Sequence, residues 1–448
     1  MDTHYQIVVL GGGESGVGAA VLAKKNGISV FVSDNNKIQQ KYIDVLKHSE
    51  IDFEDNGHSE QLILSADEII KSPGIPNTVE IILSAKSRNI PIISEIEFAA
   101  RHTSAKLICI TGSNGKTTTT LLLYHILKTS GINVGVAGNI GKSFALQVAQ
   151  NNYDVYVLEI SSFQLDDMHK VRANIAILLN ITPDHLDRYN NNFNNYVDSK
   201  FRIIQNQTAD DAFIYCFDDS VITEKLKQIE VKAQQFPFSL LPIYFKQGAY
   251  LKNEKIIIEY NKKQVHMTLE QLALQGKHNT YNSMAAGVAA RLMDIRKDTL
   301  KQCFSDFHNI AHRLEYVSSV HGIKFINDSK ATNINSTWYA LEYYNKSIVW
   351  IVGGVDKGND YSKLATLVKN KVKAIVCLGI NNRPIHKAFS DLVEIIIDTQ
   401  SSSEAVTTAY NIAKKGDTVL LSPACSSFDL FKNYEDRGNQ FKTAVKEL

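Results

Sequence analysis

Net charge, paired cysteines and long apolar runs are all scarce in this chain of 448 residues. Its 48 Lys and Arg residues are balanced by 47 Asp and Glu residues, which leaves a net charge of +1. A balance this close provides no overall field that would attract DNA, RNA or an anionic membrane. We therefore expect no nucleic-acid partner, and any anionic ligand must be held by a local site.

The five cysteines lie far apart and form neither a C-x-x-C motif nor a Cys/His metal-binding spacing. An odd, dispersed set of this kind is typical of a reducing compartment such as the cytosol. No apolar run approaches the roughly 18 residues of a membrane-spanning helix. The chain begins with a strand-like YQIVVL rather than the segments of a secretion signal. We expect a cytoplasmic protein that does not insert into a membrane.

Length and pattern together indicate an α/β protein of three domains. At about 150 residues per domain the length suggests three, and the 44% apolar content is enough for three cores. Alternating strand and helix patterns predict three consecutive Rossmann-like domains over residues 1–95, 96–309 and 310–448, the central one a P-loop-type mononucleotide-binding domain. Between residues 212 and 266, the segments AFIYCF, PIYF, AYLKN and KIIIEY are predicted to be short strands.

A glycine turn follows the first predicted strand. The sequence GGGESG at 11–16 fits G-x-G-x-x-G between a strand and a helix, and Asp34 follows the next predicted strand. The N–H groups at the start of that helix can receive a diphosphate, and Asp34 can accept a hydrogen bond from a ribose or a base. Alone, this pattern favours an NAD enzyme, with a ligand-free tight turn as the alternative.

A second glycine loop, TGSNGKTT at 111–118, also joins a strand to a helix. Its backbone N–H groups can surround phosphates, with Lys116 on the β and γ oxygens and Thr117 placed to bind Mg²⁺. Ile110 stands where a strict Walker A motif has glycine, so the loop is a shortened variant; a capped helix start is the alternative. Two such loops imply two phosphorylated ligands, and a simple dehydrogenase has no use for the second.

Polar residues at two further strand ends are candidates for a metal site. Glu159 and His185 are expected at the same sheet edge as the Lys116 loop. Taken singly, a helix cap and an ordinary loop histidine are the better interpretations, but with Thr117 they form a plausible Mg²⁺ site. Lys200 lies on a predicted helix, where a lone lysine usually faces solvent.

Three loops of the third domain carry polar residues after predicted strands, which favours a carboxylate-bearing substrate. Taken singly, each of these residues could be a loop cap or a surface charge. Cys425 lies in the last loop, where packing is a better interpretation than thiol chemistry. The loop residues are Asp328, Lys330, Thr332 and Asn333 in INDSKATN, Asp356 and Lys357 in GGVDKG, and Ser427, Tyr434 and Arg437 in the closing segment.

Taken in order, these motifs resemble the Mur ligases of peptidoglycan synthesis over essentially the whole chain. NDSKATN and the closing segment mark the branch that adds D-glutamate, and the D-N-P-R motif of the branch that adds a diamino acid is absent from the sequence. The shared motifs are the 11–16 turn, KSPGI (71–75), TGSNGKTTT (111–119), GNIG (138–141), LEISSFQL (158–165), DHLDRY (184–189), GKHNTYN (276–282), AHR (311–313), NDSKATN (327–333) and PACSSFDLFKNYEDRG (423–438).

The resemblance implies a monomeric amide ligase that uses ATP and Mg²⁺ to join D-glutamate to UDP-N-acetylmuramoyl-L-alanine through an acyl phosphate. The first domain then holds the UDP part, so the diphosphate on the 11–16 turn belongs to a UDP-sugar. The implied contacts of the UDP substrate are Ser15, Asp34, Ser72, Asn139, Gln164 and His185. Those of ATP are Gly112, Ser113, Asn114, Gly115, Lys116, Thr117, Thr118, Asn279, Asn282, Arg313, Asp328 and Lys330. Those of D-glutamate are Thr332, Lys357, Ser427, Phe428 and Tyr434.

The resemblance also changes the interpretation of Lys200, whose counterpart in such ligases is carbamylated. A carbamate is an anion that can bind Mg²⁺, whereas an ammonium repels it. The implied metal ligands become Thr117, Glu159, His185 and Lys200, and the implied catalytic residues Lys116, Glu159, His185 and Lys200. A Mur or folylpolyglutamate-type ligase for another amino acid, an NAD-dependent dehydrogenase and an ATP-driven binding protein are the alternatives.

Overall fold

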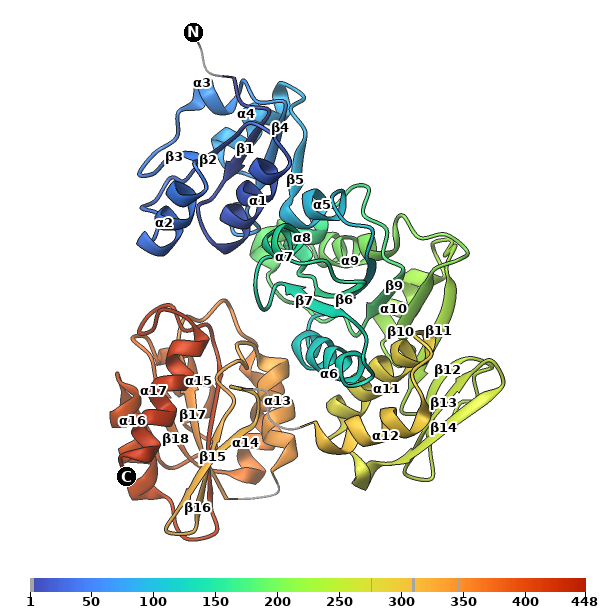
Figure 1. Ribbon diagram of the computed structural model, residues 1–448. Coiled ribbons are helices and arrows are strands. Elements are labelled where there is room, and N and C mark those ends of the chain that lie inside the picture. Colours follow the sequence, from blue (N-terminus) through green and yellow to red (C-terminus); the bar gives the residue numbers. More distant parts are fainter. Residues whose placement is uncertain (1–3, 275, 308–310, 345–346) are drawn as a thin grey trace. The chain divides into compact units, whose positions relative to one another are not determined.

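A computed structural model describes residues 4–274, 276–307, 311–344 and 347–448 (Figure 1). The chain forms two compact units, Met1–Phe307 and His308–Leu448, and each is described by itself. The predicted boundary between residues 309 and 310 lies outside the described residues, and the one near residue 95 stays a prediction. Each unit is built on parallel-rich sheets covered by helices, which confirms the predicted α/β class.

The first sheet has five parallel strands in the order β3-β2-β1-β4-β5. Its central strands are almost continuously buried because helices cover both faces. The chain order reverses at β1, so the 11–16 turn lies at the point where open α/β sheets bind ligands. The elements are β1 (Ile7–Leu10), α1 (Glu14–Lys25), β2 (Val30–Ser33), α2 (Gln40–His48), β3 (Asp52–Glu54), α3 (Glu60–Ile63), β4 (Glu68–Lys71), α4 (Glu80–Ser87) and β5 (Ile92–Ser94), followed by α5 (Glu95–Ala100).

The second sheet has nine strands in the order β14-β13-β12-β11-β10-β9-β6-β8-β7, parallel except for the β12–β13–β14 meander. β6 lies between β8 and β9, so the loops that follow these three strands meet at one edge. The elements are β6 (Lys106–Thr111), α6 (Lys116–Thr129), β7 (Val134–Gly138), α7 (Phe144–Gln150), β8 (Val155–Glu159), α8 (Ser162–Asp166), β9 (Ile175–Leu178), α9 (Phe193–Phe201), β10 (Ala212–Cys216), α10 (Ser220–Leu226), β11 (Gln234–Ser239), β12 (Gly248–Lys252), β13 (Lys255–Tyr260), β14 (Lys263–Thr268), α11 (Lys277–Leu292) and α12 (Lys297–Asp306).

The predicted strand at PIYF is wrong. Residues 242–245 have no regular structure, and Tyr244 is 67% exposed, so burial does not draw this segment into the sheet. The strand beside β10 is β11, in which Phe236 and Phe238 point into the core on either side of Pro237. Burial of two aromatic rings outweighs the weak strand preference of proline.

The third sheet has six strands in the order β15-β16-β20-β17-β18-β19, of which β15 is antiparallel to its neighbour. After β19 the chain returns to place β20 between β16 and β17. The loops after β16, β17 and β20 therefore surround one switch point. The elements are β15 (Glu315–Val320), β16 (Ile323–Asn327), α13 (Ile334–Tyr343), β17 (Ile348–Gly353), α14 (Ala365–Lys371), β18 (Val372–Leu378), α15 (Arg383–Phe389), β19 (Ile396–Thr399), α16 (Ser402–Ile412), β20 (Thr418–Ala424) and α17 (Tyr434–Lys446).

Among the described residues, no helix is long and apolar enough to cross a membrane. This agrees with the short apolar runs of the sequence.

Buried carboxylates connect the first sheet to the second. One oxygen of Glu97 accepts hydrogen bonds from the backbone N–H groups of residues 169, 170 and 171 at 3.0–3.1 Å. Glu95 accepts from the hydroxyl of Ser143 and the N–H of Ala145. Lys71 and Asp167 form a buried ion pair at 2.9 Å. Because each carboxylate receives several donors or a cation, these charges can be buried where the sheets join.

Glu95 makes the stability of this junction depend on pH. Burial raises the pKa of Glu95 to about 7 from an ordinary value of 4.5, although the Ala145 and Ser143 donors favour the charged form. The unfolded chain releases this proton at lower pH than the folded chain does. The contribution of Glu95 to the free energy of unfolding is therefore fully present below about pH 4.5 and is lost as the pH rises through about 7.

We predict that Glu95→Gln is as stable as the parent protein at pH 5 and more stable at pH 8, by at most about 3 kcal/mol. Glutamine keeps an accepting oxygen but cannot ionise, so the loss of stability at high pH disappears at this position. Urea unfolding midpoints at the two pH values measure the effect, with the exposed Glu60→Gln as the control. An equal shift at both pH values would contradict the prediction.

Candidate active site

The second glycine loop joins β6 to α6 and is held in shape by Asn180. The Asn180 side chain accepts from the Asn114 N–H at 2.8 Å and donates to the Asn114 carbonyl at 3.0 Å. Lys116 folds back over the loop, donating to the carbonyls of Gly112 and Ser113 at 2.8 and 3.0 Å. Thr117 is buried at the start of α6. The loop thus has the expected strand–loop–helix setting, and Asn180 is a structural residue that our sequence analysis missed.

Two asparagines predicted to bind ATP lie on α11, and the fold brings them to this loop. The Thr119 hydroxyl donates to Asn282 at 3.3 Å, and Asn282 donates to Asn279 at 3.3 Å. A Cβ atom on Gly115 would lie 2.3 Å from the Asn282 oxygen, and the φ angle of Gly115 is +85°. Only glycine fits there. The close approach of loop and helix therefore depends on this residue.

Glu159 ends β8 in a fully buried position next to the loop. Its Oε1 accepts from the Asn139 side chain at 2.9 Å, so Asn139 fixes the orientation of the carboxylate. Its Oε2 is buried and has no hydrogen-bond partner among the described residues. A buried carboxylate oxygen without a donor is costly unless a cation or another ligand neutralises it.

Lys200 is 1% exposed, so its interpretation as a solvated helix residue is wrong. Its ammonium donates to the Gly112 carbonyl at 3.0 Å and lies over the Tyr196 ring, 4.6 Å from the centroid. The Gly112 oxygen also accepts from Lys116, so two lysines converge on one acceptor. Burial, and then the charge of Lys116, lower the pKa of Lys200 well below its usual value.

His185 and Gln164 lie on the segments that follow β9 and β8. His185 has a left-handed backbone with φ of +53°, and its ring packs edge-on against Phe163. Its side chain is 38% exposed, so its ring can be reached by a ligand. The Gln164 side chain accepts from the N–H and hydroxyl of Ser161, forming the capping box of α8.

The first glycine turn is closed by Asp34. Its carboxylate accepts from the Gly12 N–H at 2.7 Å and from the Asn36 N–H at 2.8 Å. Ser15, at the start of α1, and Ser72, after β4, are half-buried on the same edge. The Arg188 guanidinium donates to the carbonyls of residues 73, 74 and 75, linking the DHLDRY segment to KSPGI. Arg188 is not among the predicted site residues, although it lies inside the DHLDRY motif.

In the second compact unit, Arg437 joins the three predicted substrate loops. Its guanidinium is 1% exposed and donates to the carbonyls of Ser329, Gly353 and Cys425 at 2.9–3.3 Å. These carbonyls come from the loops after β16, β17 and β20. Burial lowers the pKa of Arg437 only to about 10, so the group stays protonated at neutral pH.

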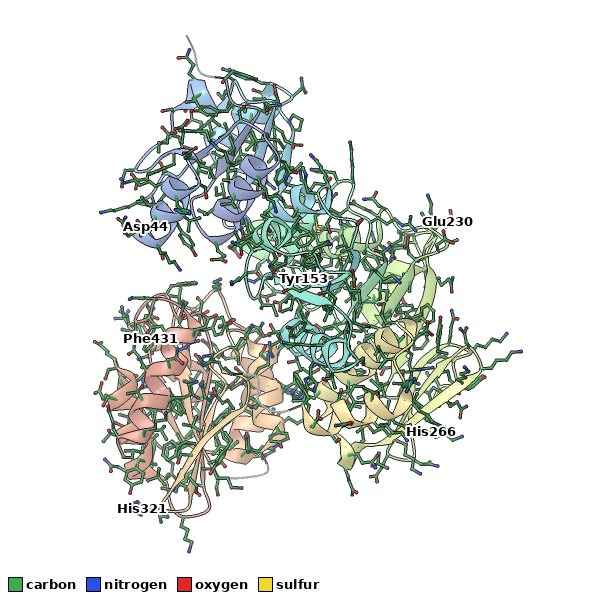
Figure 2. All side chains as sticks on the ribbon, viewed as in Figure 1. Asp44, Tyr153, Glu230, His266, His321 and Phe431 are labelled. Carbon is green, nitrogen blue, oxygen red and sulfur yellow. The ribbon has the colours of Figure 1, made fainter. Side chains whose placement is uncertain are left out.

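Of the predicted D-glutamate residues, Thr332, Lys357, Ser427 and Phe428 lie on these loops. The predicted loop position of Tyr434, like that of Arg437, is wrong, because both residues lie on α17. Ser427 is buried, Tyr434 is half-buried, and Thr332, Lys357 and Phe428 are exposed, Phe428 to 71%. The next aromatic residue, Phe431, is labelled in Figure 2 and anchors the closing segment in the core. The thiol of Cys425 is buried, and burial raises its pKa to about 11, which agrees with packing rather than catalysis.

The residues of this unit predicted to reach ATP lie on the loop after β16, except Arg313, which precedes β15. Asp328 accepts from the Leu314 N–H and the Ser422 hydroxyl. Burial raises the pKa of Asp328 to about 7, although the positive charge of Arg313 acts to lower it. Lys330 lies over the Tyr434 ring, 5.1 Å from its centroid.

Comparison with known proteins decides the family. Family models described as the MurD N-terminal domain, the Mur ligase middle domain and the Mur ligase, glutamate ligase domain match residues 6–81, 110–290 and 312–425.

This chain belongs to the Mur ligase family.

Whole-length relatives agree with this assignment. UDP-N-acetylmuramoylalanine–D-glutamate ligase of Bacteroides thetaiotaomicron is 54% identical over 446 residues, covering 99% of this chain and 100% of that protein. The protein of the same name from Cytophaga hutchinsonii is 53% identical, covering 99% of each chain. The crystal structure of UDP-N-acetylmuramate-alanine ligase from Thermotoga maritima has a TM-score of 0.63 at 17% identity, over 99% of this chain and 100% of that one. The structure of a pseudomurein peptide ligase from Methanothermus fervidus has a TM-score of 0.62 at 21% identity, over 99% of this chain and 100% of that one. Both structures support the Mur ligase fold.

We predict that Arg437→Lys lowers the kcat/KM of this Mur ligase for its amino acid about 100-fold. Lysine keeps the charge but cannot reach three carbonyls at once, so the loops lose their relative positions. Steady-state kinetics with each substrate varied in turn measure the effect. The KM for the UDP-linked substrate should not change, because the 11–16 turn, which is predicted to hold its UDP part, belongs to the other unit.

Gln440→Ala, at an exposed position of the same helix, is the matched control and should leave all constants unchanged. A uniform loss of activity with unchanged KM values in Arg437→Lys, accompanied by partial unfolding, would indicate a purely structural role.

Proposed function

We propose that this chain is the ATP-dependent ligase that joins D-glutamate to UDP-N-acetylmuramoyl-L-alanine in peptidoglycan precursor synthesis. The observation that carries this function is the 52–54% identity, over essentially the whole chain, to relatives that bear this activity in their names. The two glycine loops of the first unit, at 11–16 and 111–118, and the three polar loops of the second unit supply sites for the three anionic substrates. Action as a cytoplasmic monomer is part of the proposal.

Each proposed domain then receives one ligand. Residues 1–95 hold the UDP part through Ser15, Asp34 and Ser72, and residues 96–309 hold ATP. The muramoyl-alanine end contacts Asn139, Gln164 and His185 at the sheet edge next to the Lys116 loop. ATP contacts Gly112, Ser113, Asn114, Gly115, Lys116, Thr117, Thr118, Asn279 and Asn282. D-glutamate contacts Thr332, Lys357, Ser427, Phe428 and Tyr434.

In the proposed mechanism, the alanyl carboxylate attacks the γ-phosphate of ATP, giving an acyl phosphate and ADP. The neutral amine of D-glutamate attacks the acyl carbon, and the tetrahedral intermediate releases one proton and expels phosphate to leave the amide. The first step brings two anions together, so compensating positive charge is the main requirement. Lys116 supplies it once its ammonium leaves the Gly112 and Ser113 carbonyls for the phosphate oxygens.

The residues near Glu159 fit a divalent cation. The unpartnered Oε2 of Glu159 offers a buried anionic oxygen, and Thr117, His185 and a carbamylated Lys200 would complete the ligand set. Bound Mg²⁺ would supply positive charge next to the phosphates. Asn139 keeps the Glu159 carboxylate in one orientation, as outer hydrogen bonds of metal ligands generally do.

The surroundings of Lys200 favour carbamylation. The amine must be neutral to attack CO₂, and burial beside Lys116 favours the neutral form because it lowers the pKa of Lys200. The reaction joins the amine nitrogen to the carbon of CO₂ and releases one proton, leaving a carbamate anion. This anion would turn the repulsion between the two lysines into attraction.

A ligase of the same family for another amino acid is the second candidate function, because the middle-domain motifs are shared across the family. The 53–54% identity to D-glutamate ligases favours the first. An NAD-dependent dehydrogenase leaves the Lys116 loop without a ligand.

We predict that phosphate release from ATP requires UDP-N-acetylmuramoyl-L-alanine and D-glutamate together. A coupled phosphate assay, with each substrate withheld in turn, measures this dependence. Lys116→Ala should abolish turnover. Release without D-glutamate would favour an ATP-driven binding protein, and release with a different amino acid only would favour another branch of the family.

We predict that Lys200→Ala lowers kcat about 100-fold or more and that millimolar formate or acetate restores part of the activity. A small carboxylate can occupy the space of the missing carbamate. Lys116→Ala should not respond to these anions, because its loss removes a cation. If Lys200→Ala does not recover in any short carboxylate, the carbamate assignment fails.

A further inference from the structure

A thiol, an imidazole and a carboxylate meet at the edge of the third sheet. Cys377 on β18 and Asp398 on β19 are direct partners in the parallel ladder, so their side chains project from the same face. His386 on α15 covers that face, with Nε2 at 3.0 Å from the Asp398 carboxylate. The three potential ligand atoms all lie within 4.8 Å of one another.

We propose that Cys377, His386 and Asp398 form a binding site for Zn²⁺. One sulfur, one nitrogen and one oxygen donor match the ligand preferences of zinc, whereas Mg²⁺ prefers oxygen ligands alone. Three protein ligands leave a fourth position for water or a small ligand. Binding would displace the thiol proton to solvent and leave the sulfur as a thiolate.

The site is open to solvent on one side. His386 and Asp398 are 39% and 57% exposed and line a cavity of about 490 Å³ at the ends of β18 and β19. Cys377 is fully buried in the core cluster that packs under α15. A metal entering from the cavity side would meet His386 and Asp398 first, and the Cys377 sulfur lies within 4.8 Å of the ligand atoms of both.

Other roles for this cluster fit less well. The Cys-His-Asp order suggests a nucleophilic triad, but Cys377 is fully buried, and burial, helped by the Asp398 charge, raises the pKa of its thiol. A protonated thiol at the floor of a core is a poor nucleophile. Sequence spacing did not reveal the site, because its members come from two paired strands and a helix rather than from a short motif.

A second group of the same composition, His125, Cys303 and Asp306, provides an internal comparison. Here Cys303 and Asp306 lie on one helix, α12, and His125 lies on α6, so no paired strands hold the ligands in register. This group serves as the matched control.

The test uses the full chain, treated with a chelator, kept reduced and titrated with Co²⁺ as a spectroscopic substitute for zinc. We expect a thiolate-to-cobalt charge-transfer band whose intensity saturates at one Co²⁺ per chain. The band should disappear when Zn²⁺ displaces Co²⁺ and should remain in excess Mg²⁺. The band should be absent in Cys377→Ser and unchanged in Cys303→Ser. His386→Ala should weaken Co²⁺ binding about tenfold or more.

Absence of the band in the parent protein, its persistence in Cys377→Ser or its loss in Cys303→Ser would each overturn the proposal. If Cys377→Ser does not fold, His386→Ala and Asp398→Asn decide, because both positions are solvent-accessible; unchanged Co²⁺ affinity in both would overturn it. The metal ligands proposed above, Thr117, Glu159, His185 and Lys200, include no cysteine, so Co²⁺ bound there gives no such band. Failure of this site and failure of the proposed function are therefore distinguishable.

Discussion

The carbonyl oxygen of Gly112 accepts hydrogen bonds from two lysines, and the arrangement around the second glycine loop depends on this shared acceptor. Bringing two ammonium groups to one buried oxygen is unfavourable unless one of them gives up its proton or gains a negative group. Lys200 is the one that is buried, while Lys116 sits on the loop itself. Nearby, one buried oxygen of the Glu159 carboxylate has no hydrogen-bond donor in the part of the chain that the structure describes. Excess positive charge and excess negative charge thus both lie around this loop. Ligands that bring an anion to the lysines and a cation to Glu159 would neutralise both.

The parts of this protein that could be predicted from the sequence are those in which a local pattern suffices. The glycine loops follow strands and precede helices, so their place at the sheet edges follows from chain order alone. The burial of Lys200 could not be predicted in that way, because its partner Gly112 lies 88 residues earlier and its own helix has an ordinary polar composition. The contact of Asn282 with Thr119 spans 163 residues and depends on how α11 packs against α6. Likewise, β11 forms around Pro237 because two phenylalanines are buried, which no local preference indicates.

Strand order explains why widely separated motifs converge in the second unit. β20 is last in the chain but lies between β16 and β17, so the closing segment is placed among loops formed more than 70 residues earlier. Arg437 then holds all three loops through their backbone carbonyls. Side chains on those loops other than Ser329 can vary without loss of this connection, since the hydrogen bonds of the guanidinium among the described residues go to backbone oxygens and the Ser329 hydroxyl.

The carboxylate of Glu97, with its three backbone donors at residues 169–171, has a consequence for dividing this protein into pieces. A fragment that ends after α5 would carry Glu97 without the N–H groups that accompany its burial, and a fragment that starts at β6 would carry three N–H groups without their acceptor. Neither fragment would retain the hydrogen bonding of the intact chain. The five-stranded and nine-stranded sheets are therefore best regarded as one cooperative folding unit, although each has its own ligand loop.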